Sequence, residues 1–79
     1  MGKVKLTGKE LIETLNKDFI GKFLSFDVNN VFWTSTLELK EKREFGTVYK
    51  AKGVCFYIIE EKEYFYSFEH EAFLTIKEV

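Results

Sequence analysis

The hydrophobic period of the chain changes at Gly21, and this change limits the folds that the sequence allows. Before Gly21, apolar residues recur at the three-to-four-residue spacing of a helix, whereas after it they alternate with polar residues as in half-buried strands. One helical segment followed by several strands predicts an α+β fold. Because the chain has 79 residues, we expect one compact domain that spans residues 1–79.

The segment "LTGKELIETLNKDFIG" predicts an amphipathic helix over residues 8–20. Thr7 and Glu10 have the spacing of a capping box, in which each side chain bonds the backbone N–H of the other residue. Gly21 is placed to end the helix in a left-handed conformation. One face of the helix carries the apolar residues Leu11, Ile12, Leu15 and Phe19.

Two tight turns are predicted in the second part of the chain. Asn29-Asn30 and Lys52-Gly53 tolerate the positive φ angles of two-residue hairpin loops, which sets Phe26 opposite Trp33 and Tyr49 opposite Phe56. The charged segments at 40–44 ("KEKRE") and 60–63 ("EEKE") predict two further reversals, the first of which sets Leu39 opposite Phe45. The predicted strands are residues 22–28, 31–39, 45–51, 54–59, 64–68 and 72–78.

We expect these five to six strands to form a curved antiparallel sheet in meander order, with the helix packed on its apolar face. A small half-barrel is the alternative arrangement, if the sheet curls further. The face under the helix is predicted to carry Ala51, Val54, Phe56, Ile58 and Phe65.

The opposite face of this sheet is the candidate binding surface. Alternation places Val48, Lys50, Cys55, Tyr57, Ile59, Tyr64, Tyr66 and Phe68 on it. A domain with one helix has no second element to cover such an apolar face, and large exposed apolar patches commonly mark interaction sites. The predicted partner-binding residues are Val48, Tyr57, Ile59, Tyr64, Tyr66 and Phe68. The alternative is that the sheet curls and takes part of this face into the interior.

A second use of the same face is single-stranded nucleic-acid or nucleotide binding. Aromatic side chains stack on bases while cations hold phosphate groups. The candidate phosphate contacts are Lys40, Lys42, Arg43, Lys50 and Lys52. Against this function, Glu60, Glu61 and Glu63 adjoin the aromatic residues and would repel a phosphate backbone.

Catalytic and metal-binding patterns are weak in this sequence. His70 lies between Glu69 and Glu71, with no recognisable nucleophile motif beside it. Cys55 has a predicted cross-strand neighbour, Lys50, that could lower its thiol pKa. One His and one Cys are too few for the usual four-ligand structural metal site. We therefore expect no catalytic residues, no bound metal and no cofactor.

The charge and composition indicate the class of partner. The net charge is −1, although residues 1–53 carry +3 and residues 54–79 carry −4, so there is no global field that attracts nucleic acid. No apolar run reaches the roughly 18 residues of a membrane span, and a single cysteine suits a reducing compartment, so we expect a cytoplasmic protein with no membrane partner.

Richness in Lys, Glu, Phe, Ile, Tyr and Asn is typical of low-GC genomes, which suggests a bacterial or phage source. The predicted function is a small non-enzymatic protein that binds another protein or a second copy of itself. A concrete version is a bacterial or phage-encoded inhibitor or adaptor of a host protein or defence complex. The alternative is a module that binds single-stranded nucleic acid, a nucleotide or another small ligand.

Overall fold

A computed structural model describes residues 4–68 and 73–79. Within these ranges the chain forms one helix and eight strands, which confirms the α+β class. The helix is α1 (Gly8–Asp18). The strands are β1 (Val4–Thr7), β2 (Phe23–Val28), β3 (Val31–Thr36), β4 (Glu38–Arg43), β5 (Gly46–Ala51), β6 (Val54–Ile59), β7 (Glu63–Ser67) and β8 (Phe73–Glu78).

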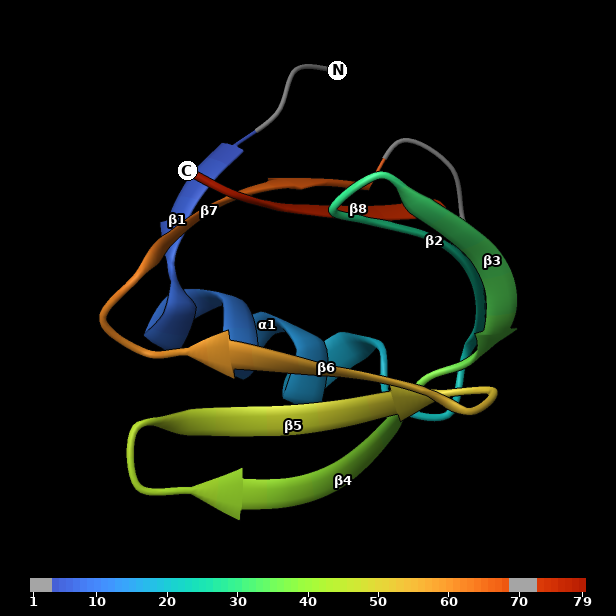
Figure 1. Cartoon of the computed structure of the whole chain (residues 1–79), viewed down its shortest axis with the longest axis horizontal. Coiled ribbons are helices and arrows are strands. Elements are labelled where there is room, and N and C mark those ends of the chain that lie inside the picture. Colours follow the sequence, from blue (N-terminus) through green and yellow to red (C-terminus); the bar gives the residue numbers. More distant parts are fainter. Residues whose placement is uncertain (1–3, 69–72) are drawn as a thin grey trace.

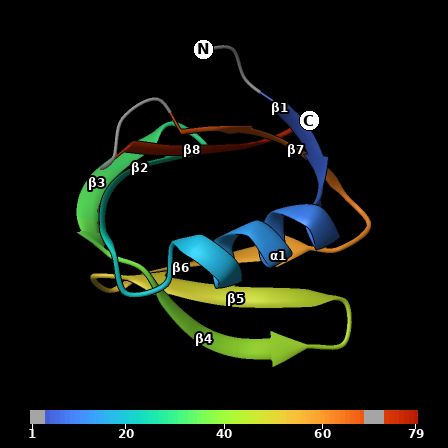
Figure 2. The same cartoon turned by 180° about the vertical axis from the view of Figure 1, so that it is seen from behind.

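The strands form two sheets that do not close into a barrel. The larger sheet has the order β1-β7-β8-β2-β3, and the smaller sheet has the order β4-β5-β6. The described ladders are antiparallel except for the parallel pair of β2 and β8. Helix α1 lies between the two sheets, close to β5 and β6 (Figures 1 and 2).

The start of α1 forms as the sequence predicts. The Glu10 backbone N–H donates to Thr7 Oγ1 at 3.2 Å, and the Thr7 N–H donates to Glu10 Oε1 at 3.0 Å, so the capping box is confirmed. The helix ends at Asp18, two residues earlier than expected. Gly21 has a φ of +83°, but its N–H donates to the carbonyl of Leu37 at 2.8 Å, so this glycine joins the helix to the strands.

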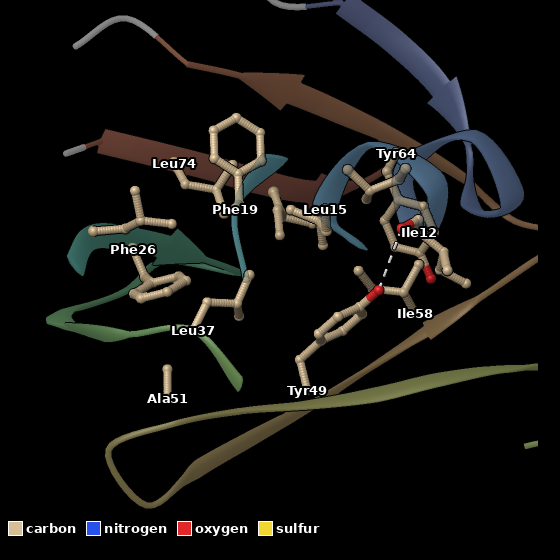
Figure 3. Close-up of a cluster of buried hydrophobic side chains, with 13 residues drawn as sticks. Ile12, Leu15, Phe19, Phe26, Leu37, Tyr49, Ala51, Ile58, Tyr64 and Leu74 are labelled. Atoms are coloured by element: carbon tan, nitrogen blue, oxygen red, sulfur yellow. Dashed lines mark hydrogen bonds between the residues drawn. The ribbon is translucent and has the colours of Figure 1, made fainter. Parts of the chain in front are cut away.

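The core lies between the sheets and beneath α1 (Figure 3). Its largest fully buried side chains are Tyr49, Phe26, Leu11, Leu15, Leu24, Leu37, Ile58 and Leu74. Tyr49 is the only one of these with a polar tip, and its hydroxyl donates to Asn16 Oδ1 at 2.8 Å. The same hydroxyl lies 3.4 Å from the carbonyl oxygen of Ile12 (Figure 3). The phenol therefore fixes the position of α1 over β5.

Stability should fall at alkaline pH because of the buried tyrosines. Burial raises the pKa of Tyr49 above its usual value near 10, and burial also raises the pKa of Tyr64 and Tyr66. The unfolded chain loses these protons first, so the stability that the buried tyrosines contribute is complete below about pH 10. Above that pH the free energy of unfolding decreases by about 1.4 kcal/mol per pH unit for each proton involved. Urea unfolding between pH 9 and pH 11.5 measures this slope. Tyr49→Phe should reduce it, and an unchanged slope in this variant would contradict the assignment.

Both predicted tight hairpins are confirmed. Positive φ angles occur at the four turn residues, which are Asn29 (50°), Asn30 (69°), Lys52 (48°) and Gly53 (82°). Phe26 lies opposite Trp33, and Tyr49 lies opposite Phe56, as the turns require. These registers follow from residues that act within a few positions of each other.

The predicted strand 31–39 is wrong, because it divides into β3 and β4, which belong to different sheets. The division occurs at Leu37, a fully buried residue that donates its N–H to the carbonyl of Lys22 at 3.1 Å. The predicted loop 40–44 is also wrong, because β4 continues to Arg43 and the chain reverses at residues 44–45. Leu39 therefore lies opposite Tyr49 and not Phe45. A run of charges in a sequence is typical of a loop, but an exposed edge strand such as β4 can also carry it.

The predicted meander order is wrong at both ends of the chain. The strands β6 and β7 do not pair, because residues 60–62 carry the chain from the smaller sheet to the larger one. Strand β7 pairs instead with β8 and with β1, a strand that the sequence did not predict. Strand β8 pairs in parallel with β2, a contact that joins residues about 50 positions apart. Pairings of this range leave no mark in the local sequence pattern.

Candidate binding cleft and edge strand

The structure divides the six predicted partner-binding residues between two sheets. Val48, Tyr57 and Ile59 lie on the outer face of the smaller sheet, where Val48 is opposite Tyr57. Tyr64 is only 4% exposed in the core. Tyr66 and Phe68 pack against the ring of Phe19, with ring centroids 6.3 and 4.8 Å apart. The expectation that all six share one exposed face is therefore wrong.

The error arises where the chain crosses between the sheets. Residues 60–62 separate β6 from β7, so the alternation of β6 does not continue into β7. Phe65, which was expected under the helix, lies opposite Lys5 and Lys77 on the outer face of the larger sheet. Tyr64 and Tyr66 therefore point inward.

The outer face of the smaller sheet keeps part of the predicted site. Tyr57 is 38% exposed, and the Arg43 guanidinium lies 5.5 Å from the centre of its ring. Arg43 also pairs with Glu41, which lowers the pKa of that carboxyl group. Val48 is buried, at 6% exposure. This face therefore offers one aromatic anchor with a partly neutralised charged border.

The five predicted phosphate contacts do not form one cluster. Lys40 and Lys50 lie near Cys55 on the outer face: the Lys40 Nζ is 3.6 Å from the Cys55 Sγ, and Lys50 is directly opposite Cys55. Arg43 shares this face. Lys42 lies on the helix side, where it and Arg43 line a separate cavity of about 270 Å³ together with residues of α1. Lys52 lies in the turn between β5 and β6.

A cleft that the sequence did not predict lies between β6 and the inner face of the larger sheet. Its volume is about 310 Å³. The larger sheet lines it with Val28, Val31, Trp33, Tyr64, Ile76 and Glu78, and β6 lines it with every residue from Val54 to Ile58. Asn29 of the hairpin turn, Cys55 and Glu78 add polar atoms to a mainly apolar lining. Val31 and Val54 are 53% and 36% exposed. The cleft arises because β6 and β7 do not pair, so only the correct long-range pairing would have predicted it.

Two hydrogen bonds tie β6 and the turn before it to the larger sheet. The Trp33 Nε1–H donates to the carbonyl of Ala51 at 3.0 Å, just before β6 begins. The Ile59 N–H donates to the hydroxyl oxygen of Tyr64 at 2.9 Å, where β6 ends. The segment of β6 between these bonds borders the cleft.

The free edge of β6 has two residues whose backbone groups lack a partner strand. In a hairpin with a two-residue loop, Val54, Phe56 and Ile58 exchange hydrogen bonds with β5, so the N–H and C=O groups of Cys55, Tyr57 and Ile59 point away from it. Ile59 uses both groups, because its carbonyl also accepts from the Lys62 N–H at 3.2 Å. Among the ladders of residues 4–68 and 73–79, none pairs the backbone of Cys55 or Tyr57 on this side.

The two edges of the smaller sheet differ in their protection. Strand β4 has the sequence "ELKEKR" and a register shift between Leu39 and Glu41. Charged side chains and bulges are the usual means by which proteins prevent an edge from pairing with another chain. Strand β6, with the sequence "VCFYII", has no charge and no register shift. The edge of β6 therefore lacks the charges and the bulge that would prevent pairing at Cys55 and Tyr57, whereas its end at Ile59 is occupied by the Tyr64 hydroxyl.

The described residues contain no group of three or more His, Cys, Asp or Glu side chains arranged to hold a metal ion. Cys55 is exposed, with the Lys40 ammonium as its polar neighbour. His70, the other residue considered for chemistry, lies outside the described residues.

In the part of the chain that the structure describes, no helix is long and apolar enough to cross a membrane. Comparison with models of protein families, with curated proteins and with solved structures found no match. The function is therefore argued from the cleft and from the free edge of β6.

Proposed function

We propose that this chain is a small non-enzymatic binding protein that acts through protein–protein contacts at β6. The observation that carries this proposal is an uncharged edge strand, with backbone groups that no described ladder pairs, beside a mainly apolar cleft. Exposed edges of this kind bind extended segments of other chains, with main-chain hydrogen bonds for affinity and side-chain pockets for specificity. Here the cleft supplies the pocket.

The outer face of β6 supports the same function. Tyr57 lies on this face beneath the Arg43 guanidinium, and tyrosine and arginine are the residue types that most often dominate binding energy at interfaces. The free edge, Val54 at the opening of the cleft, and Tyr57 all belong to β6. A bacterial or phage-encoded inhibitor or adaptor of a host protein is the concrete form that the composition and the small size favour.

Affinity capture from a lysate of the source organism tests this function. The double variant Val54→Glu/Tyr57→Ala adds a charge at the cleft mouth and removes the aromatic anchor, so it should capture the partner at least about tenfold less than the original chain. Quantitative mass spectrometry gives the ratio, and circular dichroism checks the fold. Phe32→Glu is the matched control, because Phe32 is 69% exposed on β3 and lies outside the cleft lining. Equal capture by the double variant and the control would contradict the proposal.

The alternative of nucleic-acid or nucleotide binding rests on Lys40, Arg43 and Lys50, which share the outer face with Tyr57. Glu41 pairs with Arg43 on this face and reduces its positive field. This function requires binding that weakens steeply as salt rises. If fluorescence anisotropy detects no binding of a labelled oligothymidine at low salt, the nucleic-acid alternative is excluded.

A further inference from the structure

We infer that the protein which pairs with the free edge of β6 is a second copy of this chain, joined β6 to β6 in antiparallel orientation about Phe56. This inference rests on the proposed function, because it names the chain that binds at the edge. It makes the two smaller sheets into one continuous six-stranded sheet with a two-fold axis at its centre.

The unpaired backbone groups select the register. Cys55 and Tyr57 are the residues of β6 whose outward groups lack partners in the described ladders. In a two-fold antiparallel pair, placing Cys55 opposite Tyr57 of the second copy lets both residues of each copy form bonds, which gives four main-chain hydrogen bonds. Placing Tyr57 opposite itself would set Cys55 against Ile59, whose groups already bond Tyr64 and Lys62. Placing Cys55 opposite itself would set Tyr57 against the turn residue Gly53.

The charges at the ends of β6 agree with this register. When Cys55 lies opposite Tyr57, Lys52 of each copy comes next to Glu60 of the other copy. Both residues are exposed, and neither belongs to an ion pair between described residues. The dimer therefore gains two identical opposite-charge contacts. No charge lies between them, since Val54–Ile59 carries none.

The cleft also favours an apolar strand at this position. Residues 54–58 of β6 all line the cleft, and the side chains of Val54, Phe56 and Ile58 lie on the inner face of the sheet, so the same residues of the second copy would lie beside the opening of the cleft. Val54 would lie opposite Ile58, and Phe56 opposite Phe56. These contacts would remove from water the exposed part of Val54, which is 36%. They would leave Tyr57 of both copies on one joined outer face.

A charge exchange tests the pairing. Sedimentation equilibrium from about 1 to 200 µM should give twice the chain mass in the upper part of this range, which corresponds to a dissociation constant in the micromolar range. Lys52→Glu should raise that constant at least about tenfold, and so should Glu60→Lys, because each creates two like-charge contacts. The double variant Lys52→Glu/Glu60→Lys should restore it to within about threefold. Lys77→Glu, which makes the same charge change on β8, is the control and should leave the constant unchanged.

A proline at the free edge gives an independent test. Cys55→Pro removes an N–H that does not bond β5, so this variant should keep its circular dichroism spectrum and become monomeric. A monomeric original chain at 200 µM would overturn the inference, and so would a dimer that the double charge exchange fails to restore. The proposed function is contradicted by a different result, namely equal capture of partner proteins by Val54→Glu/Tyr57→Ala and by its control Phe32→Glu. If the chain does not dimerise, the inference is wrong, but the capture experiment still tests the proposed function.

Discussion

Replacing Gly8 by alanine should lower the free energy of unfolding by about 3 kcal/mol or more. At an open helix position the same change raises stability by up to about 1 kcal/mol. The difference arises from β6, because a Cβ at Gly8 would lie 2.6 Å from the carbonyl carbon of Ile59 and would overlap its oxygen. Both atoms belong to the backbone, so no side chain can rotate away.

The close approach at Gly8 joins the helix to the crossing between the sheets. The Gly8 N–H donates to the carbonyl of Lys62 at 2.7 Å, and the Lys9 N–H donates to the carbonyl of Glu60 at 3.1 Å. These are the N–H groups that the first turn of a helix leaves without intrahelical partners. A shift that relieved the overlap would therefore also break these bonds. For a domain of this size, the combined loss is a large part of the total stability.

Urea unfolding followed by circular dichroism measures the effect. Gly53→Ala is the matched control, because Gly53 has a φ of +82° but no atom within 4 Å of an added Cβ. Its cost is only the strain of a left-handed alanine, about 1 to 2 kcal/mol. A Gly8→Ala variant at least as stable as Gly53→Ala would show that the helix does not approach β6 so closely.

The sequence predicts this fold best where one residue acts on its near neighbours. Thr7 and Glu10 determine the start of α1 because their reciprocal bonds span three residues. Asn29 and Lys52 each begin a turn with a positive φ, and the register of both hairpins follows from that turn. Tyr57 and Ile59 were correctly placed on the outer face for the same reason.

The remaining part of the fold depends on contacts between distant residues. No residue within 60–62 signals that the chain leaves the smaller sheet there, so the inward direction of Tyr64 could not be predicted from β6. The division at Leu37 depends on the carbonyl of Lys22, which lies beyond the β2–β3 hairpin. The cleft and the free edge exist only because of this rearrangement. Their sequence signal is the absence of charge from Val54–Ile59, which has a structural meaning only once β6 is known to be an edge.

Replacing Trp33 by alanine should lower the free energy of unfolding by about 3 kcal/mol, the lower end of the range for buried aromatic residues, because Trp33 is half-buried. Its ring stacks on Phe26 with centroids 5.0 Å apart and meets the ring of Phe56 edge-on at 6.4 Å. Its indole N–H also donates to the carbonyl of Ala51 at 3.0 Å. The variant loses apolar contacts within the cleft and a hydrogen bond between the sheets.

Two further substitutions separate these contributions in the same urea experiment. Trp33→Phe keeps an aromatic ring but removes the N–H, so it should cost about 1 kcal/mol. Phe32→Ala is the control on the same strand, because Phe32 is 69% exposed, and it should change stability by less than about 0.5 kcal/mol. Equal effects of Trp33→Ala and Phe32→Ala would contradict the position of Trp33 between the sheets.

The same variants connect stability to association. The Trp33 bond to Ala51 holds the Lys52-Gly53 turn against the larger sheet. This turn carries Lys52, which the proposed β6 pairing would place next to Glu60 of the second copy. Trp33→Phe should therefore weaken dimer formation more than its small cost in stability suggests, whereas Phe32→Ala should leave dimer formation unchanged. If Trp33→Phe stays fully dimeric at the lowest concentration at which the original chain dimerises, the position of this turn does not control the edge. Holding the turn in place reduces the conformational freedom that the edge loses on binding, and this preorganisation favours pairing.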